Sequence, residues 1–450
     1  MFAKVLIANR GAIACRIIRT LKDMGVGSVA VFSDADAGSL HVSQADEAVR
    51  IGPAPAAQSY LDIDAILAAA KATGAQAIHP GYGFLSENTV FAERCEAAGI
   101  AFIGPTPANI LAFGLKHTAR DLAQAQGVPL APGTDLLTDA GAARTAAERI
   151  GFPVILKATA GGGGIGMRVC ETPEAVAEAF AAVARLAGSN FSDAGVFLER
   201  YVRKARHIEV QVFGDGAGKV VALGERDCSL QRRNQKIIEE CPSPFLTPEL
   251  RARMGEASVN LIQNIGYQNA GTIEYLVDAA AENFYFMEMN TRIQVEHPVT
   301  EEVMGCELIK EQIRVAAGEP LSSHVLEATA RGHSIECRIN AEDPYNNFTP
   351  SPGTIELWYA PGGKGVRVDT HVYSGYTVPP HYDSMIAKLI VTGATREIAI
   401  ARMKRALGEF MIRGIKTTIP FQQEIIAHPD FAAGTYDIGW VARYLEERKA

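Results

Sequence analysis

The sequence predicts an α/β protein with two different sheets, a parallel one near the N-terminus and a longer antiparallel one in the middle of the chain. Between residues 4 and 78, short apolar segments alternate with helical patterns, which is typical of a doubly wound parallel sheet. Between residues 207 and 290, several segments alternate apolar and polar residues, as half-buried antiparallel strands do. From residue 331 onward strand and helix patterns are mixed, so the chain is expected to end in a mixed α+β region.

The N-terminal elements follow one another as strand, helix and strand. Residues 4–8 form a buried apolar strand, residues 11–25 show helical spacing of isoleucine and leucine, and residues 28–32 form a second strand. A helix at 61–71 then precedes a third strand at 75–78. The turn after the first strand lacks the G-x-G-x-x-G spacing that brings backbone close to a pyrophosphate, so no nicotinamide cofactor is predicted.

Composition limits the possible partners. The chain has 450 residues, which suggests about three domains, and a formal net charge of −8, which argues against a nucleic-acid-binding surface. No apolar run is long enough to span a bilayer, and the first apolar segment is too short for a secretory signal. The 7 cysteines are scattered, without a C-x-x-C pair. We therefore expect a cytoplasmic protein that binds neither nucleic acid nor membrane.

A glycine-rich segment follows a short strand that ends in Lys157. Residues 159–166 read TAGGGGIG, and residues 167–169 form the returning strand. Glycine N–H groups at such a tip can lie on phosphate oxygens, and the tip can close as a mobile flap over a nucleotide. The segment is not a Walker loop, because no G-K-[ST] opens a helix after it. A flexible turn without a ligand is the alternative.

The antiparallel strands offer further binding groups. Residues 196–202 form a strand whose backbone can pair with an adenine, and residues 207–212 and 220–223 alternate cleanly. The segment 225–236 is the most polar of the chain, and a solvated surface is its ordinary explanation. Because it follows a strand of the predicted antiparallel sheet, its basic residues are expected to offset the charge of a phosphate and a small anion.

Two carboxylates lie side by side in a predicted hairpin formed by residues 271–277 and 284–290. Glu288 and Asn290 point to one face of their strand, and Glu274 lies beside Glu288. Neighbouring carboxylates repel each other unless a cation lies between them, and Mg²⁺ in proteins binds one or two carboxylates together with substrate phosphates. The hairpin therefore predicts a magnesium site and a nucleoside triphosphate as substrate.

Arg292 and Glu296 follow directly after this hairpin. A planar guanidinium can hold a small oxyanion, and a carboxylate can accept a proton. The alternative is an ordinary hairpin with charged residues on its exposed face, which is the commoner situation for any one carboxylate. The whole run from Glu288 to Pro298 favours a catalytic site.

The remainder of the chain is predicted to contain a helical stretch at 302–317, a strand at 334–342 and another at 386–391, with a helical end. Alternation along the first of these strands places Arg338 on the face opposite Cys337 and Ile339.

Six motifs in order along the chain carry a resemblance that covers it essentially from end to end. They are IANRGAIACRI from Ile7, HPGYGFLSEN from His79, GGGGIGMRV from Gly161, ERDCSLQRRNQK from Glu225, EMNTRIQVEHPVTE from Glu288 and ECRINAEDP from Glu336. On these residues the chain resembles the biotin carboxylase family, a branch of the ATP-grasp ligases. The resemblance implies three domains: an N-terminal Rossmann-like pre-ATP-grasp domain (1–115), an ATP-grasp domain (116–330) with its lid at about 132–203, and a biotin carboxylase C-terminal domain (331–450).

The resemblance also implies the roles of individual residues. The implied ATP contacts are Lys116, Lys157, Gly163, Gly164, Glu199, Arg200, Tyr201, Val202, His207, Gln231 and Asn234. The implied ligands of Mg²⁺ or Mn²⁺ are Glu274, Glu288 and Asn290, and the two glutamates are also implied to belong to the nucleotide site. The residues implied to hold bicarbonate are Lys236, Arg292, Gln294, Val295 and Glu296. Glu296 would be the base, and Arg338 would stabilise the biotin enolate.

The implied activity is that of an ATP-dependent C–N ligase, in which bicarbonate attacks ATP to give carboxyphosphate and biotin is then carboxylated. Biotin would arrive on a carrier protein or domain, and a carboxyltransferase would pass the carboxyl group on. The family resemblance suggests a homodimer. No Met-Lys-Met biotinylation motif is present, so either a separate carrier or a longer parent protein is implied.

Three departures from the pattern of acetyl-CoA carboxylase subunits resemble the biotin carboxylase domain of urea carboxylase. They are Leu115 in place of an acidic residue, the flap sequence TAGGGGIG, and Asn234 in place of a histidine. The half-reaction does not involve the acceptor, so acetyl-CoA and a urea-type acceptor both stay open, as do other acyl-CoAs and pyruvate.

Two other functions compete with this one. The first is an ATP-grasp ligase that activates a different carboxylate, such as a carbamoyl-phosphate or purine-pathway enzyme. The second is a nucleotide-binding regulatory module without catalysis, although all the carboxylates and Arg292 are present.

Overall fold

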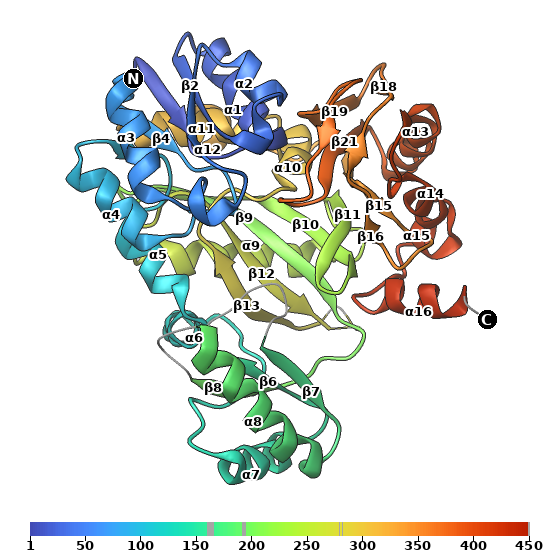
Figure 1. Cartoon of the computed structure of the whole chain (residues 1–450). Helices are drawn as coiled ribbons and strands as arrows, with labels where there is room; N and C mark the ends of the chain where they lie inside the picture. The colour runs from blue at the N-terminus through green and yellow to red at the C-terminus, as the bar shows by residue number, and fades with distance from the viewer. Residues whose placement is uncertain (160–165, 191–194, 279, 281, 449–450) are drawn as a thin grey trace.

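The computed structural model describes residues 1–159, 166–190, 195–278, 280 and 282–448. Its largest feature is a central antiparallel sheet, with the N-terminal region above one end and a three-stranded sheet projecting below (Figure 1). Gly163 and Gly164, which the sequence predicts as nucleotide contacts, lie outside the described residues.

The N-terminal sheet is parallel, as predicted, with strand order β3-β2-β1-β4-β5. Its strands are β1 (Lys4–Ile7), β2 (Gly27–Ser33), β3 (Glu47–Gly52), β4 (Ala77–His79) and β5 (Ala101–Phe102). Its helices are α1 (Gly11–Asp23), α2 (Leu40–Gln44), α3 (Ile63–Thr73), α4 (Thr89–Ala97) and α5 (Pro107–Gly114). Asp62 and Asn88 cap α3 and α4 by accepting backbone N–H groups of the first turn.

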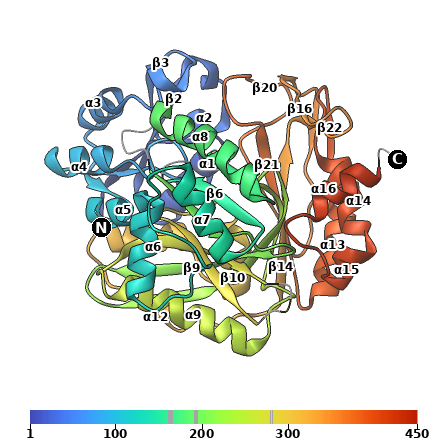
Figure 2. The same cartoon turned by 90° about the horizontal axis from the view of Figure 1, so that it is seen from below.

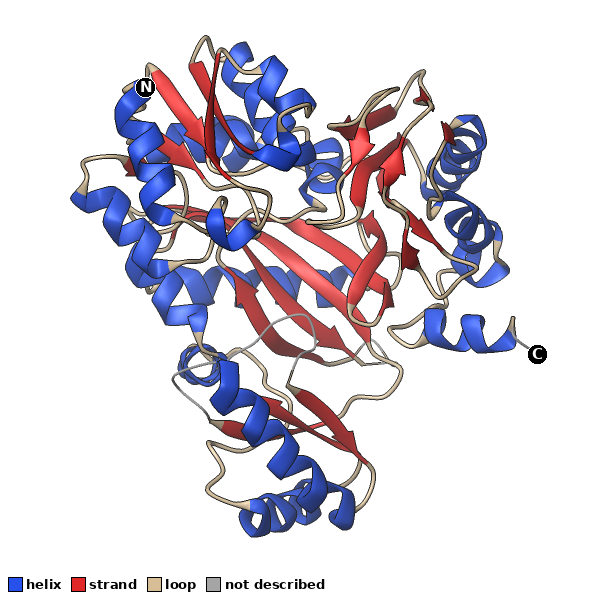
Figure 3. Ribbon diagram, in the orientation of Figure 1, coloured by secondary structure: helices blue, strands red, loops and turns tan. Residues whose placement is uncertain are grey.

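The projecting region contains a three-stranded sheet of order β7-β6-β8, backed by two helices (Figure 3). Its elements are α7 (Ala140–Ile150), β6 (Val154–Ala158), β7 (Met167–Cys170), α8 (Pro173–Asn190) and β8 (Val196–Arg200). The predicted strand ending in Lys157 and its returning partner are both confirmed, since Lys157 pairs with Met167. The core of this region consists mainly of alanine, valine and leucine and is separate from the other cores.

The central sheet has eight strands in the order β13-β12-β9-β10-β11-β14-β21-β19. The strands are β9 (Arg206–Asp215), β10 (Val220–Arg232), β11 (Gln235–Cys241), β12 (Gln268–Val277), β13 (Phe284–Asn290), β14 (His333–Asn340), β19 (Val366–Thr370) and β21 (Met385–Gly393). The C-terminal strands β14, β21 and β19 therefore extend the same sheet that carries the predicted metal hairpin. Sequence patterns alone predict only a mixed C-terminal region for them.

Alternation along β9 divides the two faces of this sheet. Ile208, Val210 and Val212 belong to the core that also holds residues of α9 (Pro248–Gln263), whereas Glu209 and Gln211 point to the opposite face. On that opposite face the sheet carries a row of charged side chains. The face is polar because it forms the floor of the site described below.

The remaining helices lie around the central sheet (Figure 2). They are α6 (Lys116–Ala125), α10 (His297–Met304), α11 (Leu308–Ala316), α12 (Ser323–Leu326), α13 (Arg396–Glu409), α14 (Ile419–Ala427), α15 (Pro429–Ala433) and α16 (Trp440–Glu447). The predicted helical stretch at 302–317 is two helices, because Gly305 adopts φ 66° and ends α10. Three short two-stranded pairs complete the C-terminal region: β15 (Glu342–Asp343) with β16 (Thr349–Pro350), β17 (Gly353–Thr354) with β20 (Thr377–Val378), and β18 (Leu357–Tyr359) with β22 (Met411–Arg413).

None of the helices in the described parts of the chain combines the length and apolar composition that a bilayer crossing needs.

Candidate active site

The two carboxylates of the predicted hairpin are direct cross-strand partners. Glu274 of β12 lies opposite Glu288 of β13, and Asn290 lies opposite Thr272. Opposite residues of an antiparallel pair place their side chains on the same face. The predicted juxtaposition of Glu274 and Glu288 is therefore confirmed, and Asn290 lies one pleat further along the same face.

Ammonium and imidazole groups balance these carboxylates. Lys116, at the start of α6, forms an ion pair with Glu288. Lys236 Nζ lies 2.9 Å from Glu274 Oε1, and His207 Nε2 lies 3.1 Å from Glu274 Oε2. Burial acts to raise the pKa of Glu274, but Lys236 and then His207 outweigh it and hold that pKa well below its ordinary value.

The donor set fits a divalent cation. The carboxylates of Glu274 and Glu288 and the amide oxygen of Asn290 are hard oxygen ligands, and all three residues line the cavity. Each carboxylate already binds an ammonium group there, Lys236 for Glu274 and Lys116 for Glu288. Glu274 also has a ligand atom within 4.8 Å of those of His207 and Glu209. Glu209 is itself paired with Lys236 and with Arg226, at 2.5 Å each, so it already has cationic partners within the protein.

Glu296 forms the centre of a second, deeper cluster. Its side chain is fully buried, with Oε1 2.6 Å from Lys236 Nζ and Oε2 2.9 Å from Arg338 Nη2. Burial opposes ionisation, yet Lys236 and Arg338 hold the pKa of Glu296 well below its ordinary value. Glu296 is therefore an ionised carboxylate that can accept a proton. Lys236 joins the two clusters, since it contacts both Glu274 and Glu296.

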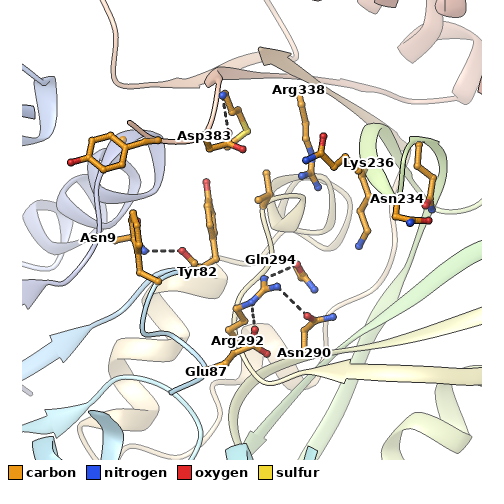
Figure 4. Close-up of a pocket in the computed structure, with 18 of the residues that line it drawn as sticks. Asn9, Tyr82, Glu87, Asn234, Lys236, Asn290, Arg292, Gln294, Arg338 and Asp383 are labelled. Atoms are coloured by element: carbon orange, nitrogen blue, oxygen red, sulfur yellow. Dashed lines mark hydrogen bonds and ion pairs between the residues drawn. The ribbon is translucent and has the colours of Figure 1, made fainter. Parts of the chain in front are cut away.

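Arg292 is oriented by three partners on three sides (Figure 4). Its Nε donates to Glu87 Oε2 at 2.7 Å, Nη1 to Gln294 Oε1 at 2.8 Å and Nη2 to Asn290 Oδ1 at 3.0 Å. Its side chain is 18% exposed and faces the cavity rather than bulk solvent. Sequence reasoning missed Glu87, although the loop at residues 79–88 that carries it follows a predicted parallel strand, where ligand-binding loops are common.

The residues predicted to contact the nucleotide are only partly gathered at the cavity. Gln231 Nε2 and His207 Nδ1 lie 2.9 Å apart, and both residues line the cavity together with Lys116, Lys157 and Asn234. Glu199 is buried and forms ion pairs with Lys157 and Arg120. The remaining three, Arg200, Tyr201 and Val202, lie at and just beyond the end of β8 and are not among the residues that line the cavity.

Burial and then the neighbouring Lys116 lower the pKa of Lys157, whereas its contact with Glu199 favours the charged ammonium. Glu199 therefore stabilises the buried charge of Lys157.

One cavity of about 700 Å³ connects these groups. Predicted residues that line it include Lys236, Glu274, Glu288, Asn290, Arg292, Gln294, Val295 and Arg338. Residues of the N- and C-terminal regions that sequence reasoning missed also line it: Asn9, Arg10, Tyr82, His371, His381, Tyr382, Asp383 and Met385. Figure 4 shows Arg338 and Lys236 entering this cavity from strands other than the one that leads to Arg292.

Comparison with protein families identifies the chain in three adjoining parts. Residues 1–110 match the family described as "Biotin carboxylase, N-terminal domain", and residues 336–443 match "Biotin carboxylase C-terminal domain". Residues 116–324 match "Carbamoyl-phosphate synthase L chain, ATP binding domain". The chain is 51% identical over 445 residues to Biotin carboxylase 1 of Bacillus subtilis (strain 168), with 99% of both proteins covered. The chain belongs to the biotin carboxylase family.

Solved structures of biotin carboxylases have the same fold. A biotin carboxylase–β-γ-ATP complex from Campylobacter jejuni is 48% identical, with a TM-score of 0.96, covering 98% of this chain and 99% of the other. The biotin carboxylase domain dimer of 2-oxoglutarate carboxylase from Hydrogenobacter thermophilus, in complex with MgADP, ADP and bicarbonate, is 47% identical, with a TM-score of 0.94, covering 99% of this chain and 98% of the other. The carbamoyl-phosphate synthase family matches only residues 116–324. The matches on both sides of it are to biotin carboxylase domains, and they distinguish this chain from a carbamoyl-phosphate synthase.

Two residues that depart from the biotin carboxylase pattern, Leu115 and Asn234, lie at a helix start and in a turn between strands. Leu115 is the N-cap of α6 and contributes no side-chain hydrogen bond to the helix start. Asn234 follows Arg233 in the tight turn between β10 and β11, where both residues have positive φ, 64° and 50°. Asparagine tolerates this left-handed conformation better than most residues, and Asn234 lines the cavity.

Proposed function

We propose that this chain is the biotin carboxylase component of a biotin-dependent carboxylase. It is an ATP-dependent C–N ligase that uses ATP and bicarbonate to carboxylate biotin on a carrier. The observation that supports this most directly is that the Glu274–Glu288 pair lines one cavity together with Lys236 and Arg338, which hold the buried Glu296, and that Lys236 contacts both Glu274 and Glu296. Such an arrangement places the end of a triphosphate next to a small anion.

The Glu296 cluster suits bicarbonate activation. Arg292 and Lys236 donate to the oxygens of bicarbonate beside Gln294 and Val295, and the ionised Glu296 takes its proton. The bicarbonate oxygen then attacks the γ-phosphorus of ATP. The bond from that phosphorus to the bridging oxygen breaks, ADP leaves, and carboxyphosphate is formed.

The second half of the reaction uses the same enclosed space. Carboxyphosphate breaks into carbon dioxide and phosphate, and the phosphate removes the proton from the ureido nitrogen of biotin. That nitrogen attacks carbon dioxide. Arg338, which lines the cavity and is fixed by Glu296 and Glu239, stabilises the negative charge that develops on the ureido oxygen.

Glu274, Glu288 and Asn290 would hold Mg²⁺ or Mn²⁺. When bound, the metal supplies positive charge to the phosphate oxygens of ATP. For the nucleotide itself we propose the cavity-lining residues Lys116, Lys157, His207, Gln231 and Asn234, and, with the lid, Gly163, Gly164 and Glu199 to Val202. The domain boundaries at residues 116 and 331 remain a prediction.

The partners follow from this chemistry. We propose a biotin carboxyl carrier protein or domain and a carboxyltransferase, and a homodimer, which the description of the Hydrogenobacter domain as a dimer supports. A cytoplasmic location agrees with the state of the cysteines, all seven of which are free. The acceptor of the carboxyl group stays open.

The deciding experiment measures ADP release with purified protein, ATP and Mg²⁺. We expect release to require bicarbonate and to increase when free biotin is added, with formation of carboxybiotin. A ligase of the carbamoyl-phosphate type would not respond to biotin. A regulatory module would bind ATP without releasing ADP, and either result would overturn the proposal.

A further inference from the structure

Two buried carboxylates that the proposed mechanism does not use face each other behind Arg338. Glu239 of β11 is the direct cross-strand partner of Glu336 of β14, and both side chains are 0% exposed. Arg338 follows Glu336 by two residues on β14, so the three side chains share one face of the sheet. Helix α10, which begins directly after Glu296, covers this face.

The hydrogen bonds of this pair are incomplete. Glu239 Oε1 accepts from Arg338 Nε at 2.6 Å, but Glu239 Oε2 and both carboxylate oxygens of Glu336 have no hydrogen-bond partner among the described residues. Lys388, the nearest lysine along the sheet, is cross-strand partner to Arg338 and donates its Nζ to the backbone oxygen of Val295 at 2.6 Å. No described Lys, Arg or His side chain forms an ion pair with Glu336.

The charged and titratable groups around the pair come from every neighbouring element. They are Lys236 on β11, Cys337 and Arg338 on β14, Lys388 on β21, Glu296 before α10, Cys228 on β10 and Tyr82 in the loop after β4. The positive charges are shared with other carboxylates, since Lys236 and Arg338 both contact Glu296. Two desolvated carboxylates with so little cationic charge of their own do not both ionise at neutral pH.

The titration behaviour agrees with this geometry. Burial raises the pKa of Glu239 to about 7 and that of Glu336 to about 8, with the attraction of Arg338 or Lys388 acting in the opposite direction. A proton between Glu239 Oε2 and one carboxylate oxygen of Glu336 would also give two of these three buried oxygens a partner.

We propose that Glu239 and Glu336 share one proton and act as a positioning pair, which holds Arg338 between Glu239 and Glu296 for the biotin-carboxylating step. The inference rests on the proposed function. With one proton, the pair carries a single negative charge, and Arg338 has one carboxylate on Nε and one on Nη2. Its Nη1 has no partner among the described residues, and Arg338 lines the cavity, so both N–H groups of that nitrogen are available to biotin.

Loss of the shared proton adds a negative charge next to the guanidinium of Arg338. A second negative charge behind the guanidinium attracts it away from Glu296 and from the cavity, because the pair is buried and poorly screened. The biotin-dependent rate should therefore fall as the pH rises through the titration of the pair. Glutamine at position 336 mimics the protonated state, since its amide can donate to Glu239 but cannot ionise.

Three variants test the pair: Glu336→Gln, Glu239→Gln and, as a matched control, Glu240→Gln. Glu240 is the next residue on β11, equally buried, and points to the other face, where it binds His333 and Arg396. The first measurement is the infrared carbonyl band of a protonated carboxyl group at neutral pH. We expect the wild-type spectrum minus the Glu336→Gln spectrum to contain this band, and the Glu240→Gln difference to lack it.

The second measurement is the pH profile of biotin-stimulated ADP release. We expect Glu336→Gln to move or remove the alkaline decrease. Glu239→Gln keeps an oxygen that can accept from Arg338 Nε but loses the negative charge that attracts the guanidinium, and we expect it to lower the biotin-dependent rate by about 10- to 100-fold. Absence of the carbonyl band, or an alkaline decrease that Glu240→Gln changes as much as Glu336→Gln does, would overturn the inference. The infrared result does not depend on turnover, so failure of the proposed function itself would be recognised separately.

Discussion

The carboxylates at the two ends of the cavity differ in their exposure and in their ionic partners. At the hairpin end, the Glu288 side chain is 30% exposed and has one ionic partner among the described residues, Lys116. At the other end, the Glu296 side chain is 0% exposed and is held by Lys236 and Arg338, one on each oxygen. Glu288 and Glu296 are only eight positions apart in the sequence, so the difference arises from the elements that surround them.

This contrast separates two tasks. Charges at the exposed end are partly screened by water, so substitutions there should affect ligand binding more than folding. Charges at the buried end depend on one another, and removal of one partner leaves another charge buried without compensation. The hairpin end is therefore suited to a metal and phosphates that come and go, and the Glu296 end to a fixed orientation of reacting groups.

The largest effect is expected at the exposed end. Glu288→Lys replaces a proposed metal ligand by a second ammonium beside Lys116, and we expect it to abolish metal-dependent ADP release. The thermal unfolding midpoint should change little, because Glu288 is half-exposed and has a single partner. Both are measured on the same preparation over a series of Mg²⁺ concentrations.

Glu282→Lys, an exposed charge reversal near the turn of the same hairpin, is the matched control and should retain turnover. Full activity of Glu288→Lys would show that the metal assignment is wrong.

At the buried end, Glu296→Gln should lower bicarbonate-dependent ADP release by about 10²- to 10⁴-fold, because the proposed general base is lost, while ATP binding is kept. Unlike Glu288→Lys, it should also lower the unfolding midpoint, since Lys236 and Arg338 lose a charged partner. Glu301→Gln is the control: Glu301 lies on α10, is buried and is paired with Arg16 and Arg367 rather than with the cavity-lining Lys236 and Arg338. It should share the loss of stability and keep turnover.

The exposed end could be predicted from sequence because it is local. Alternation and a short polar turn between two strands were sufficient to place Glu274 opposite Glu288, and the register agrees. The alternation of β14 likewise placed Arg338 correctly on its own strand. The parallel N-terminal sheet also followed from strands and helices that are consecutive in the chain.

The buried end could not be predicted in the same way, because its contacts join distant segments. Glu239 meets Glu336 only because β14 pairs with β11 and extends the central sheet, and no local pattern specifies that pairing. Glu87 reaches Arg292 from a loop of the N-terminal sheet for the same reason. The resemblance to a family supplied the roles of Glu296 and Arg338, whereas the residues that hold them required the fold.

Arg292 lies between the two ends, and its substitution should have an intermediate effect. Arg292→Lys keeps the charge but loses the planar fork that contacts Glu87, Gln294 and Asn290. We expect the KM for bicarbonate to rise by about 10- to 100-fold, the equivalent of one or two charged hydrogen bonds, with a smaller change in kcat. Steady-state kinetics at varied bicarbonate would show this, and an unchanged KM would exclude Arg292 from anion binding.

The smallest effect concerns the free energy of unfolding as a function of pH, and its sign differs among the buried carboxylates around the cavity. The pKa values of Glu274 and Glu296 are depressed chiefly by Lys236 against the effect of burial, so the stability that they contribute is present above the ordinary value of 4.5 and is lost as the pH falls. Burial raises the pKa of Glu239 and Glu336, so their contribution is full below 4.5 and is lost as the pH rises to about 8.

Denaturant titrations at several pH values should therefore show a decline in stability toward neutral and mildly alkaline pH, with a slope of about 1 kcal/mol per pH unit for each proton that only the folded state retains. Glu336→Gln should flatten this decline, because the variant has no proton to lose at that position, whereas Glu288→Gln at the exposed end should leave the slope as it is. Equal slopes in wild type and Glu336→Gln would mean that both ends of the cavity carry fully ionised carboxylates, and the contrast between them would then be one of solvent exposure alone.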